Sequence, residues 1–324
     1  MMKFGILGLG NHAKSRVMPA IARAGHEISA IYSRKIEKAR EEGSKYSSRA
    51  YDSLEGFMKS GIDAVYIASP NFLHYEQAKQ SLLNGKHVLL EKQMTLRNDH
   101  ASELVRLAAD KGLALAVGFH LRFHPAIGHV RKMIQEGRLG ELTYISGIWA
   151  GYSSRNYDNP DNKWWMEDEQ AGGGSVMWTG VHVMDTINYI AGEAPQSVNC
   201  FKIPRGAVID STEQVSIQYP SVVASAVSSR RIRNSENSLV VCGTGGTVTV
   251  RGMFSTDVNS RLLLGAEPME QFSGPNMYEE EVKAFNDLVR GHSSVIATGS
   301  DGELVVRMVN AASAAEKEGR SVKL

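Results

Sequence analysis

Residues 8–13 have the types and spacing of a phosphate-binding loop. They read Gly-Leu-Gly-Asn-His-Ala, the pattern G-x-G-x-x-A, and directly follow the short strand-like run 4–7. Gly8 permits a tight turn, Gly10 lets backbone approach a pyrophosphate, and Ala13 keeps the next helix close to the strand. Free N–H groups at the start of that helix bind the anion. A glycine pattern alone is weak evidence, but this one opens a strand–helix–strand unit, so we expect it, with Asn11 and His12, to hold a dinucleotide.

The end of the second predicted strand indicates which dinucleotide is preferred. About twenty residues past the glycines, NAD enzymes place an acidic residue for the adenine ribose. This chain has Ser33 and Arg34 there, with Lys38 nearby on the following helix. A carboxylate would repel the 2′-phosphate of NADP, whereas a serine and an arginine accept it through charge-assisted hydrogen bonds. The pattern favours NADP, and the alternative is a solvated basic start of a helix.

Lys92 is the candidate for proton transfer. Hydride transfer also needs a group that gives or takes the proton of the substrate oxygen. Lys92 follows the apolar run 87–90 and therefore lies at the carboxyl edge of the predicted sheet, where Rossmann ligands bind. A lysine that is partly desolvated and near an oxidised nicotinamide should have a lowered pKa and exchange a proton near neutral pH. The alternative is a surface lysine that ends a strand.

His182 and Asp185 form a second candidate pair. They are three residues apart on a predicted helix and therefore share one face. An Asp185 that accepts from one ring nitrogen would fix the tautomer of His182 and leave the other nitrogen for a substrate hydroxyl. Alternatively, His182 packs against the sheet and Asp185 caps or pairs locally.

Composition and spacing exclude other classes of protein. The 324 residues are 42% hydrophobic and carry 36 Lys and Arg against 35 Asp and Glu, a net charge of +1. No basic excess points to nucleic acid or an anionic membrane. His120 and His124 have helical spacing but no third ligand, and Cys200 and Cys242 form no Cys-x-x-Cys pair, so we expect no metal. The N-terminus lacks a signal-peptide layout and no run is long enough to span a membrane, so we expect a cytoplasmic protein with a small-molecule partner.

The elements that must position these residues change character part-way along the chain. The first third alternates strands with helices, which predicts a parallel sheet covered on both faces. The middle is rich in strands that follow one another closely, which favours an antiparallel, one-sided sheet. We expect strands at 4–7, 27–32, 63–68, 87–90, 113–117, 142–149, 197–203, 213–219, 222–228, 238–241, 247–250 and 261–264. Helices are expected between the early strands and at 125–135, 180–190, 278–289 and 301–317.

Four further segments occur in a recognisable order. They are 68–74 (ASPNFLH), 91–93 (EKQ), 122–126 (RFHPA), and 172–174 (GGG) with 180–185 (GVHVMD). With the N-terminal loop and 319–322 (GRSV), they resemble the glucose–fructose oxidoreductase/inositol dehydrogenase (Gfo/Idh/MocA) family over nearly the whole chain. The resemblance implies an α/β Rossmann domain and an α+β domain with a large open, mostly antiparallel sheet that forms the substrate wall and a dimer or tetramer face. It also implies that the C-terminal helices return to the first domain, giving domains 1–122 with 276–324, and 123–275.

The resemblance also assigns site residues. Lys92 matches a catalytic lysine and His182 a substrate-binding histidine. The positions that it places around the cofactor, beyond the phosphate loop, are Ser69, Pro70, Asn71, His74, Glu91, Lys92, Arg122 and Trp165.

Three positions depart from the family pattern. Trp178 stands where many members have an aspartate four residues before the histidine, and it either stacks on a sugar face or packs inward. Gln93 replaces the proline after the lysine, so we expect no constrained Lys–Pro bond. Met166 replaces an arginine next to Trp165.

Together these features predict an NADP-preferring dehydrogenase or reductase of a sugar, polyol or related compound. Two alternatives stay open from the sequence. One is a catalytically weak NADP-binding sensor or regulator, because the family aspartate and proline are replaced. The other is a reductase of a non-sugar substrate, such as an aromatic dihydrodiol or a tetrapyrrole, because Trp164, Trp165 and Trp178 make that stretch apolar.

Overall fold

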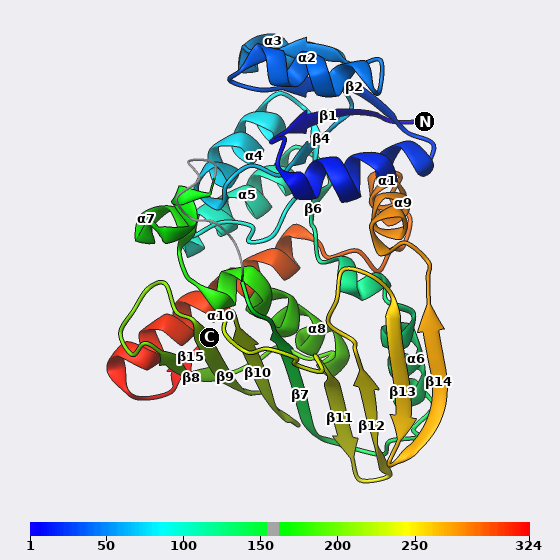
Figure 1. Ribbon diagram of the computed structural model, residues 1–324, viewed down its shortest axis with the longest axis vertical. Coiled ribbons are helices and arrows are strands. Elements are labelled where there is room, and N and C mark those ends of the chain that lie inside the picture. The colour runs from blue at the N-terminus through cyan, green and yellow to red at the C-terminus, as the bar shows by residue number, and fades with distance from the viewer. Residues whose placement is uncertain (154–161) are drawn as a thin grey trace. The chain divides into compact units, whose positions relative to one another are not determined.

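The fold was obtained as a computed structural model, and it describes residues 1–153 and 162–324. The chain divides into two compact units (Figure 1). Unit 1 comprises Met1–His120 and Tyr278–Val306, and unit 2 comprises Leu121–Met277 and Arg307–Leu324. Each unit is built around its own sheet.

The sheet of unit 1 is parallel throughout the described residues, in the order β3-β2-β1-β4-β5-β6. Its interior strand β4 is buried along its whole length, as expected where helices cover both faces. The order steps outward from β1 in both directions, which creates the crevice between β1 and β4 where Rossmann domains bind ligands. The strands are β1 (Lys3–Leu7), β2 (Glu27–Tyr32), β3 (Arg49–Tyr51), β4 (Ala64–Ile67), β5 (His87–Leu90) and β6 (Leu115–Val117).

Helices alternate with these strands, as the sequence predicts. They are α1 (Met18–Arg23), α2 (Ile36–Ser44), α3 (Leu54–Met58), α4 (His74–Leu83) and α5 (Asn98–Asp110), with 3₁₀ turns at Asn71–Leu73 and His120–Phe123. The helix after β1 opens with a π-helical segment, Ala13–Val17. Far along the chain, α9 (Met277–Val289) packs back on this unit: Glu279 accepts from Arg23 of α1 at 3.2 Å, and the ring of Phe285 lies 6.0 Å from that of Phe4 in a tilted arrangement.

The sheet of unit 2 has the order β14-β13-β12-β11-β7-β10-β9-β8-β15 in the residues described. All neighbours are antiparallel except β7 and β10, which run parallel. The strands are β7 (Leu142–Ala150), β8 (Ser197–Ile203), β9 (Thr212–Gln218), β10 (Val223–Ser229), β11 (Leu239–Gly243), β12 (Gly246–Arg251), β13 (Asn259–Leu264), β14 (Glu267–Ser273) and β15 (Val322–Lys323).

One face of this sheet is covered and the other is open. Along β9 and β10, buried residues alternate with more exposed ones, which is the pattern of a one-sided sheet. Helix α8 (Val181–Ala191) lies against β7 and β10 on the covered face (Figure 1). The other helices of this part are α6 (Pro125–Gln135) and α7 (Asp168–Ala171), with a 3₁₀ turn at Lys163–Met166 and a π-helical segment at Val176–Gly180 that leads into α8.

The C-terminal residues differ from the expected division of the chain. We expected 276–324 to pack with the first domain, but the boundary falls inside α10 (Gly299–Glu318), and Arg307–Leu324 cluster with unit 2. The contacts explain this difference. Glu316 accepts from the backbone N–H of Gly206 at 2.8 Å, Met308 Sδ accepts from Asn188 at 3.2 Å, and β15 adds to β8 as an antiparallel strand.

Candidate active site

The phosphate loop has the geometry that its glycines predict. Gly8 has a φ of +99°, and a Cβ on it would lie 2.5 Å from the backbone carbon of Ala68 and the nitrogen of Ser69. Only glycine meets both conditions, because φ is in the left-handed region and the loop packs directly on the residues after β4. At Gly10 the nearest atom to a built Cβ is 4.0 Å away, so the space beside it is open. Ala13 is fully buried at the start of the helix.

The expected ribose-binding residues lie at the carboxyl end of β2. Ser33 is bonded through its N–H to the carbonyl of Tyr51 at 3.0 Å, and its hydroxyl accepts from the N–H of Lys35 at 3.2 Å. Arg34 and Lys38 are exposed, at the start of α2. The structure therefore brings one hydroxyl and two cationic side chains to this end of the strand.

Glu91 connects the end of β5 to the phosphate loop. Its carboxylate is buried, accepts from the hydroxyl of Tyr66 at 2.9 Å, and lies 3.3 Å from Nε2 of His12. Burial opposes ionisation of Glu91, but His12, Lys92 and the Tyr66 hydrogen bond outweigh it and lower the pKa to about 2. His12 also packs edge-on against Tyr278 at 5.2 Å. Sequence reasoning proposed Glu91 and His12 separately, and the structure places them in contact.

His74 connects the loop after β4 to the loop after β5. Its ring is fully buried, with Nδ1 2.7 Å from the carbonyl oxygen of Gln93 and Nε2 2.8 Å from that of Ser69. Ser69 is held further by its hydroxyl, which donates to Gln77 at 2.6 Å, and Asn71 is buried in the same loop. The residues of the Ser69 loop that we expected beside the cofactor are therefore packed against the residue that follows Lys92.

Lys92 lies immediately after Glu91, beyond the end of β5, and is partly exposed. The peptide bond from Lys92 to Gln93 is cis. The Gln93 side chain is buried, and its Oε1 has no hydrogen-bond partner among the described residues.

In unit 2, Arg122 and Asp185 form a buried ion pair. Nε of Arg122 donates to both carboxylate oxygens at 3.2 and 3.0 Å, and Nη2 donates to Oδ1 at 2.6 Å. The two side chains are only 6% and 1% exposed, and the guanidinium also lies 4.8 Å from the ring centre of Tyr189. We expected Arg122 beside the cofactor and Asp185 beside His182. In this structure the two side chains are partners in one ion pair.

His182 belongs to an aromatic group on the covered face of the sheet in unit 2. Its ring is buried and lies 5.2 Å from that of Trp149, at the end of β7. The hydroxyl of Thr179 donates to the carbonyl of Trp149 at 3.0 Å. Trp178, in the π-helical segment before α8, is half-buried with its ring edge 3.6 Å from the position of a Cβ on Gly151. Trp149 was not among the expected site residues, and its place at the end of a predicted strand is the signal that could have identified it.

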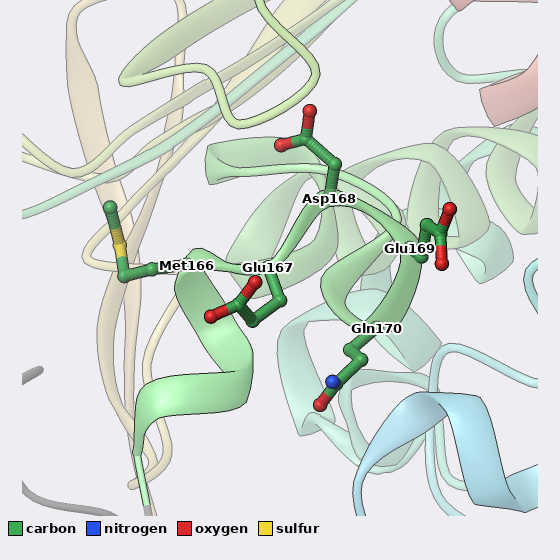
Figure 2. Close-up of a pocket in the computed structure, with 5 residues that line it drawn as sticks. All are labelled: Met166, Glu167, Asp168, Glu169 and Gln170. Atoms are coloured by element: carbon green, nitrogen blue, oxygen red, sulfur yellow. The ribbon is translucent and has the colours of Figure 1, made fainter.

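Trp165 stacks on Trp164 with ring centres 4.2 Å apart, in the short Lys163–Met166 turn. Next to it is a shallow hollow of about 410 Å³ lined by Met166, Glu167, Asp168, Glu169 and Gln170. Figure 2 shows that these side chains spread in different directions rather than converging on one point. A ligand site needs convergent polar groups in an apolar cleft, so this acidic hollow is not a candidate active site.

The predicted site residues thus fall into two groups. The phosphate loop, the Ser69–His74 loop, Glu91 and Lys92 belong to unit 1, whereas Arg122, Trp165, Trp178, His182 and Asp185 belong to unit 2. Across residues 1–153 and 162–324, no group of three or more His, Cys, Asp or Glu side chains is arranged to hold a metal ion. In the same residues, no helix has the length and apolar character required to cross a bilayer.

Comparison with known proteins decides the family. Residues 2–119 match the model of the Gfo/Idh/MocA oxidoreductase family with its NAD-binding Rossmann fold, and residues 127–249 match the model of the C-terminal domain of the same family. The chain belongs to the Gfo/Idh/MocA family. The resemblance noted from the motifs is confirmed, and so is the fold of a parallel Rossmann sheet followed by a mostly antiparallel open sheet.

Individual family members are similar along the whole chain. The 1,5-anhydro-D-fructose reductase of Ensifer adhaerens is 29% identical over 93% of this chain and 92% of its own length. The D-xylose 1-dehydrogenase (NADP⁺) 2 of Haloferax volcanii is 26% identical over the full length of both. Among solved structures, the aldose–aldose oxidoreductase of Caulobacter crescentus, complexed with glycerol, superposes with a TM-score of 0.89 at 25% identity, covering 100% of this chain and 99% of its own. The chain is therefore an NAD(P)-dependent oxidoreductase.

Proposed function

We propose that this Gfo/Idh/MocA enzyme transfers hydride between NADP(H) and a hydroxyl or carbonyl carbon of a sugar or cyclic polyol. The names of its relatives, which act on anhydrofructose and xylose, support the sugar class. One observation carries the catalytic part of the proposal. Lys92 directly follows Glu91, whose buried carboxylate pairs with His12 of the phosphate loop. The lysine that follows β5 is thus adjacent in sequence to a residue that contacts the phosphate loop.

The loop after β1 suits a dinucleotide. The left-handed Gly8 and the open space beside Gly10 leave backbone N–H groups accessible to a pyrophosphate, as such loops require. When bound, the nicotinamide supplies or accepts the hydride. Ser33, Arg34 and Lys38 support a preference for NADP, because their hydroxyl and cationic groups can bind a 2′-phosphate that a carboxylate would repel.

Lys92 then handles the proton. In reduction its ammonium gives a proton to the substrate oxygen, and in oxidation its amine takes the proton of the hydroxyl. His182 binds and orients a substrate hydroxyl, and Trp149 holds its ring in place. Trp178 presents an indole face, in place of the usual carboxylate, that can stack on the C–H face of a sugar ring. Asp185 supports His182 from the next turn of α8.

The function is tested by turnover. Purified enzyme with NADP⁺ or NADPH is offered aldoses, ketoses, inositols and an aromatic trans-dihydrodiol, and formation or loss of reduced nicotinamide is followed by absorbance. We expect turnover with at least one sugar or polyol. In Lys92→Gln, the rate should fall by about 10²–10⁴-fold, the usual contribution of general acid–base catalysis. The affinity for NADPH should change little.

Two results would contradict this proposal. If the enzyme binds NADPH but converts no sugar or polyol, the substrate class is wrong, and turnover of the dihydrodiol alone would identify the replacement. If Lys92→Gln turns over as fast as the wild type, another group handles the proton. Lys111→Gln, an exposed lysine at the end of α5, is the control for the loss of one positive charge.

We also propose that the open face of the unit 2 sheet joins two copies of the chain. Large apolar side chains are exposed on this face: Phe201 (66%), Ile203 (62%), Val223 (44%) and Tyr144 (38%). Exposed apolar residues that follow successive strands of one sheet are typical of a protein–protein interface.

A further inference from the structure

Both ring nitrogens of His74 face backbone carbonyl oxygens, and only one protonation state of the ring can donate a hydrogen bond to each. It is the first residue of α4, and its ring is fully buried. Nδ1 lies 2.7 Å from the carbonyl oxygen of Gln93 and Nε2 lies 2.8 Å from that of Ser69. Both separations are hydrogen-bond distances, and both partners are backbone carbonyls, which only accept.

A neutral imidazole has one N–H donor and one bare lone pair. A neutral His74 would therefore donate to one carbonyl and direct its lone pair at the other. The imidazolium has two N–H donors and satisfies both carbonyls at once.

The surroundings of His74 act in both directions. Burial, the largest influence, lowers its pKa, and the positive charge of Lys92 lowers it further. The hydrogen bonds to Gln93 and Ser69 and the negative charge of Glu91 raise the pKa. Together these influences lower the pKa of His74. A buried carbonyl that faces a lone pair is itself unfavourable, however, and the presence of two accepting carbonyls at hydrogen-bond distance favours the charged ring.

We propose that His74 is a positioning residue that works as an imidazolium, donating to both the Ser69 and Gln93 carbonyls and so fixing the backbone that follows β4 to the backbone that follows β5. The Gln93 carbonyl belongs to the residue directly after Lys92, so this bond sets the place of the Lys92 backbone. The cation has a second effect. Because like charges repel, a charged His74 disfavours the ammonium form of Lys92 and favours its uncharged amine. The uncharged amine is the form that accepts a proton from a hydroxyl. This inference rests on the proposed role of Lys92, but the charge of His74 can be measured without it.

The direct test is nitrogen NMR of the ¹⁵N-histidine-labelled enzyme without cofactor or substrate, with His74→Gln used to assign the resonance. We expect both ring nitrogens of His74 to remain protonated at neutral pH, where an unperturbed histidine is mostly neutral. A His74 ring with one unprotonated nitrogen at neutral pH would overturn the proposal. Neither result depends on which substrate the enzyme uses, so failure here is distinct from failure of the proposed function.

Kinetics then test the effect on Lys92. A glutamine side chain cannot donate to two carbonyls on opposite sides, so His74→Gln should lower kcat by about tenfold to a hundredfold, as small misplacements of a reacting group do. In the oxidation direction, the pH at which kcat rises should also shift upward, because removing the cation stabilises the ammonium of Lys92. A purely structural role for His74 would not move this pH.

The control is His100→Gln, which removes a partly exposed histidine stacked 3.7 Å from Tyr75. We expect its kcat and pH profile to match the wild type. A folded His74→Gln with wild-type kcat and an unchanged pH profile would contradict the positioning role. If that variant fails to fold, the NMR measurement on the wild-type enzyme still decides the charge, with the resonance assigned by exclusion using single variants of the other histidines.

Discussion

Arg34 is the residue on which the choice of cofactor is expected to depend. It is exposed at the end of β2, beside Ser33, where NAD enzymes carry an acidic side chain. We predict that Arg34→Asp binds NADPH about tenfold to a hundredfold more weakly, because a charge-assisted hydrogen bond is lost and a repulsion gained. The affinity of this variant for NADH should stay the same or increase. Calorimetry with both cofactors measures the two affinities.

Arg40→Asp makes the same change of charge on an exposed residue of α2, after Arg34. It should leave the ratio of the two affinities almost unchanged. Equal loss of NADPH and NADH binding in Arg34→Asp would show that the arginine does not discriminate between the cofactors.

Two histidines contact the residues that precede and follow Lys92 in the sequence. His12 contacts Glu91 from the phosphate loop, and His74 contacts the carbonyl of Gln93. The position of Lys92 could be predicted, because the strand before it is a short apolar run that ends there. The contacts of His12 and His74 could not be predicted, because their partners are far apart in sequence and the contacts depend on how the loops pack.

Among the elements, α8 is tied to the chain after β6 by the Arg122–Asp185 pair. Both side chains are buried, so replacing one leaves the other as an uncompensated charge. We predict that Arg122→Met lowers the free energy of unfolding by about 3–5 kcal/mol, and that Arg122→Met with Asp185→Leu recovers most of the loss. Urea unfolding followed by circular dichroism measures both.

The matched control is Arg320→Met, which breaks an exposed pair with Glu318 at 2.6 Å. Exposed pairs contribute little, so the loss should stay under about 1 kcal/mol. Should Arg122→Met unfold at the same urea concentration as Arg320→Met, the buried pair would not have the stabilising role assigned to it.

The strands and helices that the sequence revealed are those with a strong pattern. β4 is wholly buried and β8 alternates cleanly, and both were expected within a residue or two of their observed bounds. β3 and β15 were missed because three and two residues are too few to show a period. β14 was missed because most of its residues are exposed and polar. The π-helical segments before α1 and α8 were also missed, since a π turn has no distinct residue pattern.

For the whole molecule, we predict a dimer that depends on the open face of the sheet. Light scattering after gel filtration should give twice the chain mass for the wild type. Phe201→Glu with Ile203→Glu should weaken association by at least about tenfold, because charges replace two exposed apolar side chains of β8. The enzyme should remain folded.

Leu83→Glu provides the comparison, since Leu83 is an exposed apolar residue (46%) at the end of α4 in unit 1. Its mass in solution should equal that of the wild type. A wild-type monomer at micromolar concentration, or a dimer indifferent to the β8 substitutions, would count against the open-face interface.

The division of the chain was the least predictable property at this scale. Periodicity reveals two C-terminal helices but not where they pack, and the family resemblance assigned both to the first domain. The observed boundary falls inside α10, whose later part makes long-range contacts within unit 2, such as Glu316 with Gly206, that no local sequence pattern predicts.

The two outer strands of the unit 2 sheet limit how it can recruit another chain. β15 is only two residues long, which leaves few free backbone groups for a strand to pair with. β14, at the opposite edge, contains Pro268, which has no N–H to donate to another strand. Its pairing with β13 also shifts register between Leu262 and Leu263 of β13. Both edge strands of the described sheet therefore disfavour the addition of another strand by backbone pairing. Growth into fibres by edge-to-edge pairing is thereby disfavoured, even though the sheet is wide.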